Sequence, residues 1–291
     1  MAAIYLKRFH LPSDAKEIKF LVDQKRTCYS GVYPFKIFPD KGLQTLEFAP
    51  VTILYGGNGS GKTTLLNIFA EKLGLERHSA FSSGAFFPTY LKDCRAEAWD
   101  IPDGSQILTS DDVSDYLLNL RALNDGIDLR REELLEAFYQ LKWDDRPLAS
   151  LEDYDRWKKA TEAKTTTSSK FVKGRLCKNV SMTSNGETAM GYYTERIRQD
   201  ALYLIDEPEN SLSAAYQREL ADFLSDSARF FGCQLVIATH SPFFLAIPGA
   251  RIYDLDSRPV CVQPWTELDN VRVYFDFFQE HYDAFEQGDT L

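Results

Sequence analysis

The sequence predicts an α/β fold: a core built on a parallel sheet, an antiparallel β-subdomain at the N-terminus and an inserted helical lobe. Two continuously apolar runs, residues 201–205 and 233–238, are typical of parallel strands that helices cover on both faces. A third apolar run, residues 51–55, leads directly into a glycine-rich loop that opens a helix. Residues from about 90 to 178 instead show the spacing of amphipathic helices.

The N-terminal part opens with three short stretches patterned like strands, residues 4–10, 35–38 and 43–48. Together with the strand at 51–55 and the helix after the glycine loop, they make up a first segment, residues 1–89. The first eight residues lack the charged-then-apolar order of a secretory signal. No apolar run approaches the roughly 20 residues that a membrane helix needs. We therefore expect a cytoplasmic protein without membrane contact.

The composition is that of a globular protein, with 44% hydrophobic and 26% charged residues in a chain of 291. The 33 basic and 43 acidic residues give a formal net charge of −10, which argues against a protein that coats nucleic acid or membranes indiscriminately. The five cysteines are odd in number and widely spaced, without a Cys-x-x-Cys pair. Neither a disulfide framework nor a zinc site is expected.

The middle segment, residues 90–178, is assigned to the helical lobe because its apolar residues recur three and four positions apart. One such set is Val113, Tyr116, Leu117 and Leu120, and a second is Leu134, Leu135, Phe138 and Leu141.

The last segment, residues 179–291, returns to the core. A helix that Gly232 terminates separates its two apolar strands. Strands at 251–255 and 259–262 and an aromatic helix over 271–285 are expected to follow.

The glycine-rich loop has the spacing of a phosphate-binding loop, Gly-x-x-x-x-Gly-Lys-Thr, between a buried type of strand and a helix. Its backbone amides and the positive end of the helix are suited to phosphates. Lys62 is predicted to reach the β- and γ-phosphates, and Thr63 to coordinate Mg²⁺. A glycine-rich turn with a chance lysine is the alternative, which the flanking strand and helix disfavour. The predicted nucleotide-binding residues are Gly56, Gly57, Asn58, Gly59, Ser60, Gly61, Lys62, Thr63 and Thr64.

Two adjacent carboxylates end the strand at 201–205. The carboxyl ends of parallel strands line the ligand crevice of a doubly wound sheet, so both acids are predicted to face the phosphates. Asp206 is the expected metal residue, holding Mg²⁺ through a water, and Glu207 the residue that orients or deprotonates the attacking water. The alternative is a pair of solvated turn acids before Pro208.

A histidine follows the next apolar strand, at 233–238. A single histidine is more often structural than catalytic, but His240 stands at a matching strand end. It is therefore a candidate to contact the γ-phosphate and the catalytic water.

These segments resemble the ABC-type ATPases, in particular the soluble RecF/SMC-like branch of AAA-family ATPases related to the overcoming-lysogenization-defect proteins. Residues 56–63 look like Walker A, 202–207 like Walker B, 210–213 like the D-loop, and His240 like the H-loop histidine. Residues 180–187 are similar to the ABC signature; its matching positions are Ser184, Gly186 and Glu187.

The resemblance implies a head-to-tail homodimer in which the signature of one copy closes over ATP and Mg²⁺ held by the other. Three departures suggest slow or partner-dependent hydrolysis: Asn185 replaces a signature glycine, Ser213 replaces the D-loop aspartate, and Gln106 is only the nearest candidate for the Q-loop glutamine. The 51 residues after His240 are too few for a Toprim nuclease, and no long heptad run is present. An effector is therefore expected on a separate partner protein.

The function expected first is an ATP-gated dimer switch that acts with a partner protein or nucleic acid in DNA repair or anti-phage defence. The alternative is the nucleotide-binding subunit of an ABC transporter, and a nucleotide kinase ranks third. One basic segment, Trp157–Lys178, holds seven basic residues and a single acid, Glu162. It is either an ordinary solvated face or, beside the signature, a contact for DNA or RNA.

Overall fold

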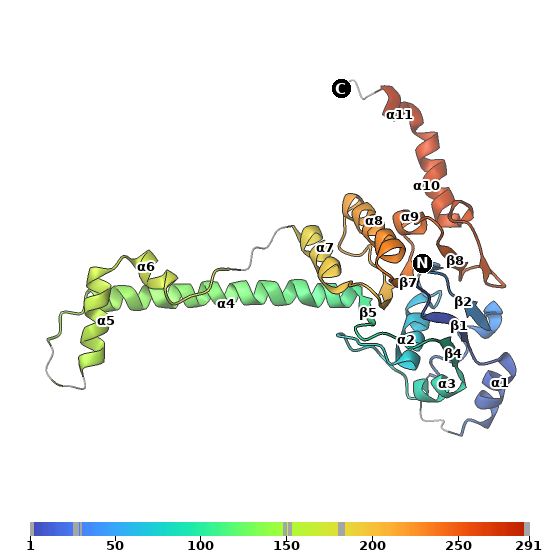
Figure 1. Cartoon of the computed structure of the whole chain (residues 1–291), viewed down its shortest axis with the longest axis horizontal. Helices are drawn as coiled ribbons and strands as arrows, with labels where there is room; N and C mark the ends of the chain where they lie inside the picture. Colours follow the sequence, from blue (N-terminus) through green and yellow to red (C-terminus); the bar gives the residue numbers. More distant parts are fainter. Residues whose placement is uncertain are drawn as a thin grey trace. The chain divides into compact units, whose positions relative to one another are not determined.

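The computed structural model describes residues 3–25, 29, 31–147, 150, 153–179 and 184–287. The chain forms two compact units (Figure 1). The core unit comprises residues 1–113 and 189–291, and the helical unit comprises residues 114–188.

A six-stranded sheet organises the core unit, in the order β5-β6-β7-β3-β8-β9. Its strands are β3 (Val51–Tyr55), β5 (Gln106–Thr109), β6 (Leu202–Asp206), β7 (Gln234–Thr239), β8 (Arg251–Asp254) and β9 (Cys261–Val262). All neighbouring strands are parallel except β8 and β9. The predicted α/β fold with a parallel sheet is confirmed.

The register brings four strand ends together at one edge of this sheet. Tyr55 lies opposite Thr239, and Asp206 lies opposite Ala238. Thr109, the last residue of β5, lies opposite Asp206. The residues that follow these strands therefore gather at the carboxyl edge, where ligands bind in open α/β sheets.

A second, three-stranded antiparallel sheet contains β2 (Thr45–Glu47), β1 (Leu6–His10) and β4 (Arg95–Ala98), in that order. The helix after the glycine loop, α2 (Lys62–Leu73), packs against both sheets. The ring centroid of Phe69 lies 4.6 Å from that of Phe9 and 5.4 Å from that of Phe48. These rings belong to a buried apolar cluster that joins the small sheet to the core.

The remaining elements of the core unit lie around these sheets. They are α1 (Asp14–Asp23), the 3₁₀ helix η1 (Pro39–Lys41), α3 (Phe87–Asp93), α7 (Asn185–Arg196), α8 (Ala214–Phe230), α9 (Pro242–Leu245), the 3₁₀ helix η3 (Trp265–Glu267), α10 (Asp269–Glu280) and α11 (Tyr282–Gln287). The first residues of α7, up to Thr188, belong to the helical unit. The aromatic helix expected over 271–285 is thus two helices with a break at His281.

Residues 35–38 were expected to form a strand, which is wrong. They lie in a turn that leads into η1, and Lys36 has a left-handed φ of 72°. Such a backbone conformation interrupts any strand. Phe35 and Phe38, three positions apart, are both buried, whereas in a strand they would point to opposite faces.

The domain division at 89 and 178 stays a prediction, and the compact units divide the chain elsewhere. The segment expected as a helical lobe, residues 90–178, begins with β4 and β5, which pair with strands of the core unit. The helical unit itself starts within α4 (Ser110–Lys142).

Two shorter helices of the helical unit pack on the C-terminal part of α4 (Figure 1). They are α5 (Tyr154–Thr165) and α6 (Ser168–Lys173). A small buried cluster unites the three helices: Leu134, Phe138, Ala163, Phe171 and Val172. Among the described residues, no helix combines the length and the apolar character needed to cross a membrane.

Candidate active site

The glycine-rich loop connects the end of β3 to the start of α2. Two of its glycines are required by the backbone. A Cβ at Gly56 would lie 2.6 Å from the Ser60 hydroxyl oxygen, and one at Gly61 would lie 3.0 Å from the ring of Phe38. Gly61 also has a φ of 101°, a conformation that side chains other than glycine rarely adopt. The sequence therefore keeps the loop tight, with its amides at the start of the helix.

Lys62 is held inside this loop. Its ammonium nitrogen donates to the carbonyl oxygens of Gly56 at 2.7 Å and Gly57 at 3.2 Å, and only 4% of the side chain is exposed. A hollow of about 280 Å³ lies beside it, lined by residues 58–64, Ile37 and Glu207. The predicted phosphate-binding residues after Gly57 thus line one hollow, with the lysine cation at its wall.

Asp206 lies buried at the end of β6 and hydrogen-bonds with the side chain of Thr63. Burial raises the pKa of its carboxyl to about 6, although the bond with Thr63 lowers it. Its Oδ1 atom has no hydrogen-bond partner. An unpaired buried carboxylate oxygen beside a hydroxyl fits a hard cation such as Mg²⁺.

No group of three or more His, Cys, Asp or Glu side chains able to hold a metal occurs in the described part of the chain. A cation held by Thr63 and Asp206 would therefore need further ligands from phosphate and water. Mg²⁺ commonly binds proteins in this way, through one or two protein ligands plus phosphates.

Glu207 projects from the strand end toward the loop. Its φ of 47° is left-handed, and its amide donates to the carbonyl of Ala238 at 2.9 Å. One carboxylate oxygen lies 3.7 Å from the ammonium of Lys62, and the other accepts from the side-chain amide of Asn210 at 3.1 Å. The side chain is 26% exposed. A carboxylate that is partly solvated and borders a hollow, on a strained backbone, is well placed to orient or deprotonate a water molecule.

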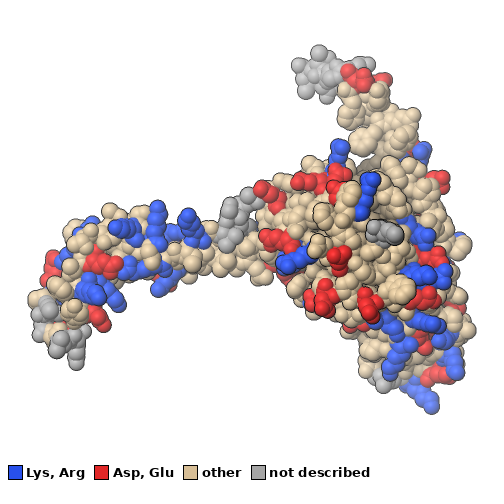
Figure 2. All heavy atoms as spheres, in the orientation of Figure 1, with Lys and Arg blue, Asp and Glu red and all other residues tan. Residues whose placement is uncertain are grey.

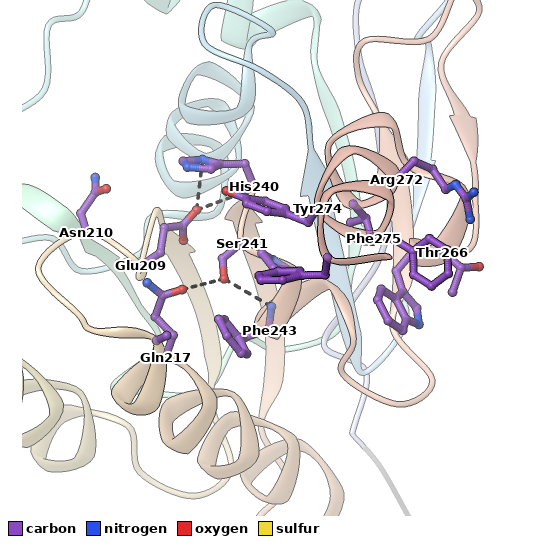
Figure 3. A pocket seen from close by; sticks show the side chains of 15 residues that line it. Glu209, Asn210, Gln217, His240, Ser241, Phe243, Thr266, Arg272, Tyr274 and Phe275 are labelled. Carbon is purple, nitrogen blue, oxygen red and sulfur yellow. Dashed lines mark hydrogen bonds and ion pairs between the residues drawn. The ribbon is translucent and has the colours of Figure 1, made fainter. Parts of the chain in front are cut away.

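His240 follows β7 and is held by Glu209, which is buried (Figure 3). One carboxylate oxygen of Glu209 accepts from the backbone amide of His240 at 2.9 Å and lies 3.2 Å from its Nδ1. The other oxygen accepts from the Thr239 hydroxyl at 2.8 Å. The Glu209 carboxylate thereby fixes the histidine ring from its Nδ1 side. Sequence reasoning assigned Glu209 no role, because the acids of the turn are alike in sequence and only burial separates them.

Lys41 and Asp256 also brace the loop, and sequence reasoning missed both. The ammonium of Lys41 donates to the carbonyls of Ser60 at 2.8 Å and Leu255 at 2.5 Å. Burial lowers the pKa of Lys41, and the charge of Asp256 opposes that shift. Asp256 accepts from the Gly57 amide at 2.7 Å. No signal in the sequence links these isolated charges to a loop up to 199 positions away.

A second hollow, about 480 Å³, is lined in part by Thr63 and Asp206, the residues predicted to hold the metal. Arg77 lines it with its guanidinium 4.2 Å over the ring of Phe81 and donates to Asn67 at 2.5 Å. Burial lowers the pKa of Arg77.

Gln106, the nearest candidate for the Q-loop glutamine, lies elsewhere. It is the first residue of β5, at the opposite edge of the sheet, and donates to the carbonyl of Arg196 at 3.4 Å. The residues at the carboxyl end of that strand, which reach the hollow, are Thr109, Ser110 and Asp111. The candidate is therefore wrong, because a residue at the amino end of a parallel strand cannot face the phosphate edge.

The signature positions Ser184, Gly186 and Glu187 lie at the start of α7, in the helical unit. The Ser184 hydroxyl accepts from the amide of Glu187 at 3.3 Å, the bond of a helix N-cap. Asn185 accepts from the guanidinium of Arg121 on α4 at 2.9 Å. Residues 180–183 of the expected signature lie outside the described residues.

The basic residues of Trp157–Lys178 lie on α5, on α6 and in the segment that follows α6, and Figure 2 shows many cationic side chains over the helical unit. Arg175 pairs with Glu162 at 2.8 Å, and Lys164 with Asp145 at 2.9 Å. The other cationic side chains are exposed: Lys158, Lys159, Lys170, Lys173 and Lys178.

These residues were expected beside the signature, but the helices α5 and α6, which carry most of them, pack on another part of α4 than Asn185 does. Asn185 contacts α4 at Arg121, whereas Phe171 of α6 packs on Phe138 of α4. Arg121 and Phe138 are 17 positions apart, which corresponds to roughly 25 Å of helix at a rise of about 1.5 Å per residue.

Residues 180–246 match the model of a family described as "AAA domain, putative AbiEii toxin, Type IV TA system". This segment contains Asp206, Glu207 and His240. The match confirms the resemblance drawn from the motifs, and together with the phosphate-binding loop it identifies an ATP-binding, ATP-hydrolysing P-loop ATPase. No curated protein matches the sequence of this chain.

Solved structures similar to the chain include the Smc head domain of Pyrococcus furiosus with an extended coiled coil, bound to the C-terminal domain of ScpA. That comparison has 13% identity and a TM-score of 0.43, and covers 96% of this chain and 99% of the other. The SMC head domain of Thermotoga maritima has 12% identity, covers 90% and 99%, and gives a TM-score of 0.40. A putative metal-chelate type ABC transporter has 17% identity, covers 80% and 81%, and gives 0.39.

Proposed function

We propose that this ATPase is an Mg²⁺-dependent switch in which two copies close head to tail over two ATP molecules, and hydrolysis loosens them. The observation that supports it most is the convergence of the functional side chains at one sheet edge. Lys62 stands at the start of α2, and Asp206 and Glu207 stand at the end of β6. His240 follows the neighbouring strand β7 and is held by Glu209.

Each side chain has a distinct part in this proposal. Lys62 exchanges its bonds to the loop carbonyls for phosphate oxygens, a change from neutral to charged acceptors that strengthens them. Thr63 and Asp206 hold Mg²⁺, which neutralises phosphate charge when bound. Glu207 takes a proton from the attacking water, and His240 contacts the γ-phosphate and that water.

The signature residues Ser184, Gly186 and Glu187 are proposed to contact the ATP held by the other copy. They stand at the N-terminal end of a 12-residue helix, where free backbone amides and the helix dipole favour an anion. The departures at Asn185 and Ser213 lead us to expect slow hydrolysis unless a partner stimulates it.

The biological role that we propose is anti-phage defence or DNA repair, with the effector on a separate protein. The matched family description names a putative toxin of a type IV toxin–antitoxin system, which supports the defence alternative. The exposed lysines of α5 and α6 are the proposed contact for DNA or RNA. A cytoplasmic location stays a prediction.

Two variants test the switch. Glu207→Gln is expected to lower ATP turnover by roughly 10²- to 10⁴-fold, the range for loss of a general base, and to accumulate as a dimer with ATP and Mg²⁺. Lys62→Ala is expected to lose ATP binding and to stay monomeric. Steady-state phosphate release and the mass from light scattering after size exclusion measure both effects.

Glu219→Gln, an exposed substitution on α8, is the matched control and should behave like the wild type. Wild-type turnover in Glu207→Gln would overturn the role given to Glu207. A Glu207→Gln protein that binds ATP but stays monomeric would overturn the dimer switch.

A further inference from the structure

The two helices α10 and α11 expose an unusual number of large apolar side chains. Six of them are between 51% and 69% exposed: Val273, Phe275, Phe277, Phe278, Tyr282 and Phe285. In α10, only Val271 is buried. A contiguous apolar surface of this kind marks an interaction site more often than an ordinary solvated face.

One face of α10 continues into a groove of about 790 Å³ (Figure 3). Val271, Tyr274, Phe275 and Phe278 share that face, since they are spaced three and four residues apart, and all line the groove. The rest of the wall includes Phe243 and Pro242 of α9, Trp265 of η3 and Gln217 of α8, with Glu209 and His240 among its polar residues. The groove is thus a trough of aromatic side chains between helices, which suits a helix with apolar anchors.

Four of the polar residues that line the groove already bond to one another in two pairs. Ser241 donates to the side-chain oxygen of Gln217 at 2.7 Å, and Glu209 holds His240. A ligand that enters the groove is therefore recognised through its apolar side chains and not through these groups.

The charge around the aromatic face indicates which kind of molecule it would bind. Residues 269–287 contain five carboxylates, Asp269, Asp276, Glu280, Asp283 and Glu286, against a single arginine, Arg272. Arg272 is itself paired with Asp276 at 3.3 Å. A second copy of the same face, a nucleic acid or an anionic lipid surface would bring like charges together, whereas a cationic segment would be attracted.

We propose that the aromatic face of α10 and α11, with the groove that it borders, binds a cationic amphipathic helix of another protein. Its apolar side chains enter the aromatic trough, and its Lys or Arg side chains face the five carboxylates. This inference rests on the proposed function in one respect, because the helix belongs to the separate partner expected for this ATPase.

The docking surface is linked to the ATP site through Asn270, at the start of α10. Its side-chain amide donates to the carbonyl of His240 at 3.2 Å, and its backbone amide donates to the Tyr55 hydroxyl at 3.1 Å. A bound partner helix that displaces α10 therefore also displaces the backbone of His240, the residue predicted to sense the γ-phosphate. Binding at the groove and the state of the nucleotide are thereby coupled.

Binding is tested with a fluorescent helical peptide of leucine and lysine, and with its counterpart of leucine and glutamate, on the nucleotide-free wild-type protein. Fluorescence anisotropy should show binding of the lysine peptide alone. Phe275→Ala with Phe278→Ala is expected to weaken it at least ten-fold, and Asp276→Lys with Asp283→Lys by a similar factor.

Matched controls are placed on other helices, outside the residues that line the groove. Phe230→Ala removes another exposed phenylalanine, and Glu132→Lys with Glu136→Lys changes the net charge equally on α4. Loss of binding in these controls, equal binding of both peptides, or no loss in the surface variants would overturn the proposal. It would also be overturned if Phe275→Ala with Phe278→Ala converted a nucleotide-free dimer to a monomer, because the face would then join two copies.

The coupling has its own readout. The lysine peptide should change the ATP turnover of the wild type at least two-fold, and Asn270→Ala should retain peptide binding while losing that change. An unchanged response in Asn270→Ala would overturn the link to His240. Because binding is measured without nucleotide, failure of the docking surface and failure of the proposed ATP switch are distinguishable.

Discussion

The carboxylate of Glu209 contacts His240 at two atoms, accepting from its backbone amide at 2.9 Å and lying 3.2 Å from its ring nitrogen Nδ1. Glu209 is almost fully buried, whereas the ring of His240 is 44% exposed. The backbone and the ring of the histidine are therefore positioned by one buried group that uses Nδ1, so that Nε2 would serve the proposed contact with the γ-phosphate.

Replacing Glu209 should impair both stability and turnover. Glu209→Ala leaves the Thr239 hydroxyl and the His240 amide without their acceptor, at a cost of about 1–3 kcal/mol for a buried unsatisfied group. Loss of an outer partner that orients a functional histidine typically costs about 10- to 100-fold in activity. Urea unfolding and phosphate release measure the two effects. Glu209→Gln, which keeps one acceptor, should lie between Glu209→Ala and the wild type, and a silent Glu209→Ala would contradict the positioning role.

The pH dependence of stability should depend on Asp206. Its carboxyl pKa is raised from 3.8 to about 6 by burial, so the folded state binds a proton more tightly than the unfolded state. The nucleotide-free protein is therefore expected to lose stability as the pH rises from about 4 to about 6, by up to roughly 3 kcal/mol.

Urea unfolding at pH 5 and pH 7.5 without nucleotide tests this expectation. Asp206→Asn should be more stable than the wild type at pH 7.5 and should show a smaller decrease between the two pH values. Binding of Mg²⁺ and ATP requires the ionised carboxylate, so it should weaken below about pH 6 in the wild type. An equal pH dependence in both proteins would contradict the assignment.

Lys41 should contribute to nucleotide affinity without touching the nucleotide. It ties the loop at Ser60 to the turn after β8, so Lys41→Met should leave the loop less ordered. Two lost hydrogen bonds of about 1 kcal/mol each correspond to a dissociation constant for ATP raised roughly ten-fold or more. Isothermal titration measures it. The exposed Lys19→Met is the control, and equal affinity in both variants would contradict the bracing role.

The proposed nucleic-acid contact predicts a specific salt dependence. Replacing Lys170, Lys173 and Lys178 by Glu should weaken DNA or RNA binding and lower the slope of log affinity against log salt by about 1 per lost phosphate contact. Anisotropy titrations with a labelled oligonucleotide between low and physiological salt measure the slope.

The control carries the same charge change on the core unit, with Glu at Lys7, Lys19 and Lys92, all exposed. It should leave the slope unchanged. If the α6 variant keeps the wild-type affinity and slope, the basic face is an ordinary solvated surface.

Several elements of the core were predictable because their signals are local. The strands β3, β6 and β7 are largely apolar runs, and glycines, acids or a histidine mark where they end. The phosphate loop has a fixed spacing in a recognisable setting. Such patterns reflect backbone and burial preferences within a few residues, which a sequence displays directly.

Two predictions of secondary structure were wrong for identifiable reasons. The strand β4, Arg-Ala-Glu-Ala, is polar and only partly buried, so its pairing with β1 and not its composition makes it a strand. Residues 35–38 look apolar enough for a strand, but the left-handed Lys36 turns the chain.

By itself, the sequence determined the loop, the two acids at the end of β6 and the histidine after β7, because each depends on neighbours within one strand and its turn. Only the tertiary structure decided that Glu209 orients His240 and that Asp256 caps the amide of Gly57. It also showed that Gln106 lies at the amino end of β5 and not at the phosphate edge of the sheet. The physical reason is register: parallel pairing sets which strand ends meet, and that brings together charges from distant parts of the chain that no local pattern connects.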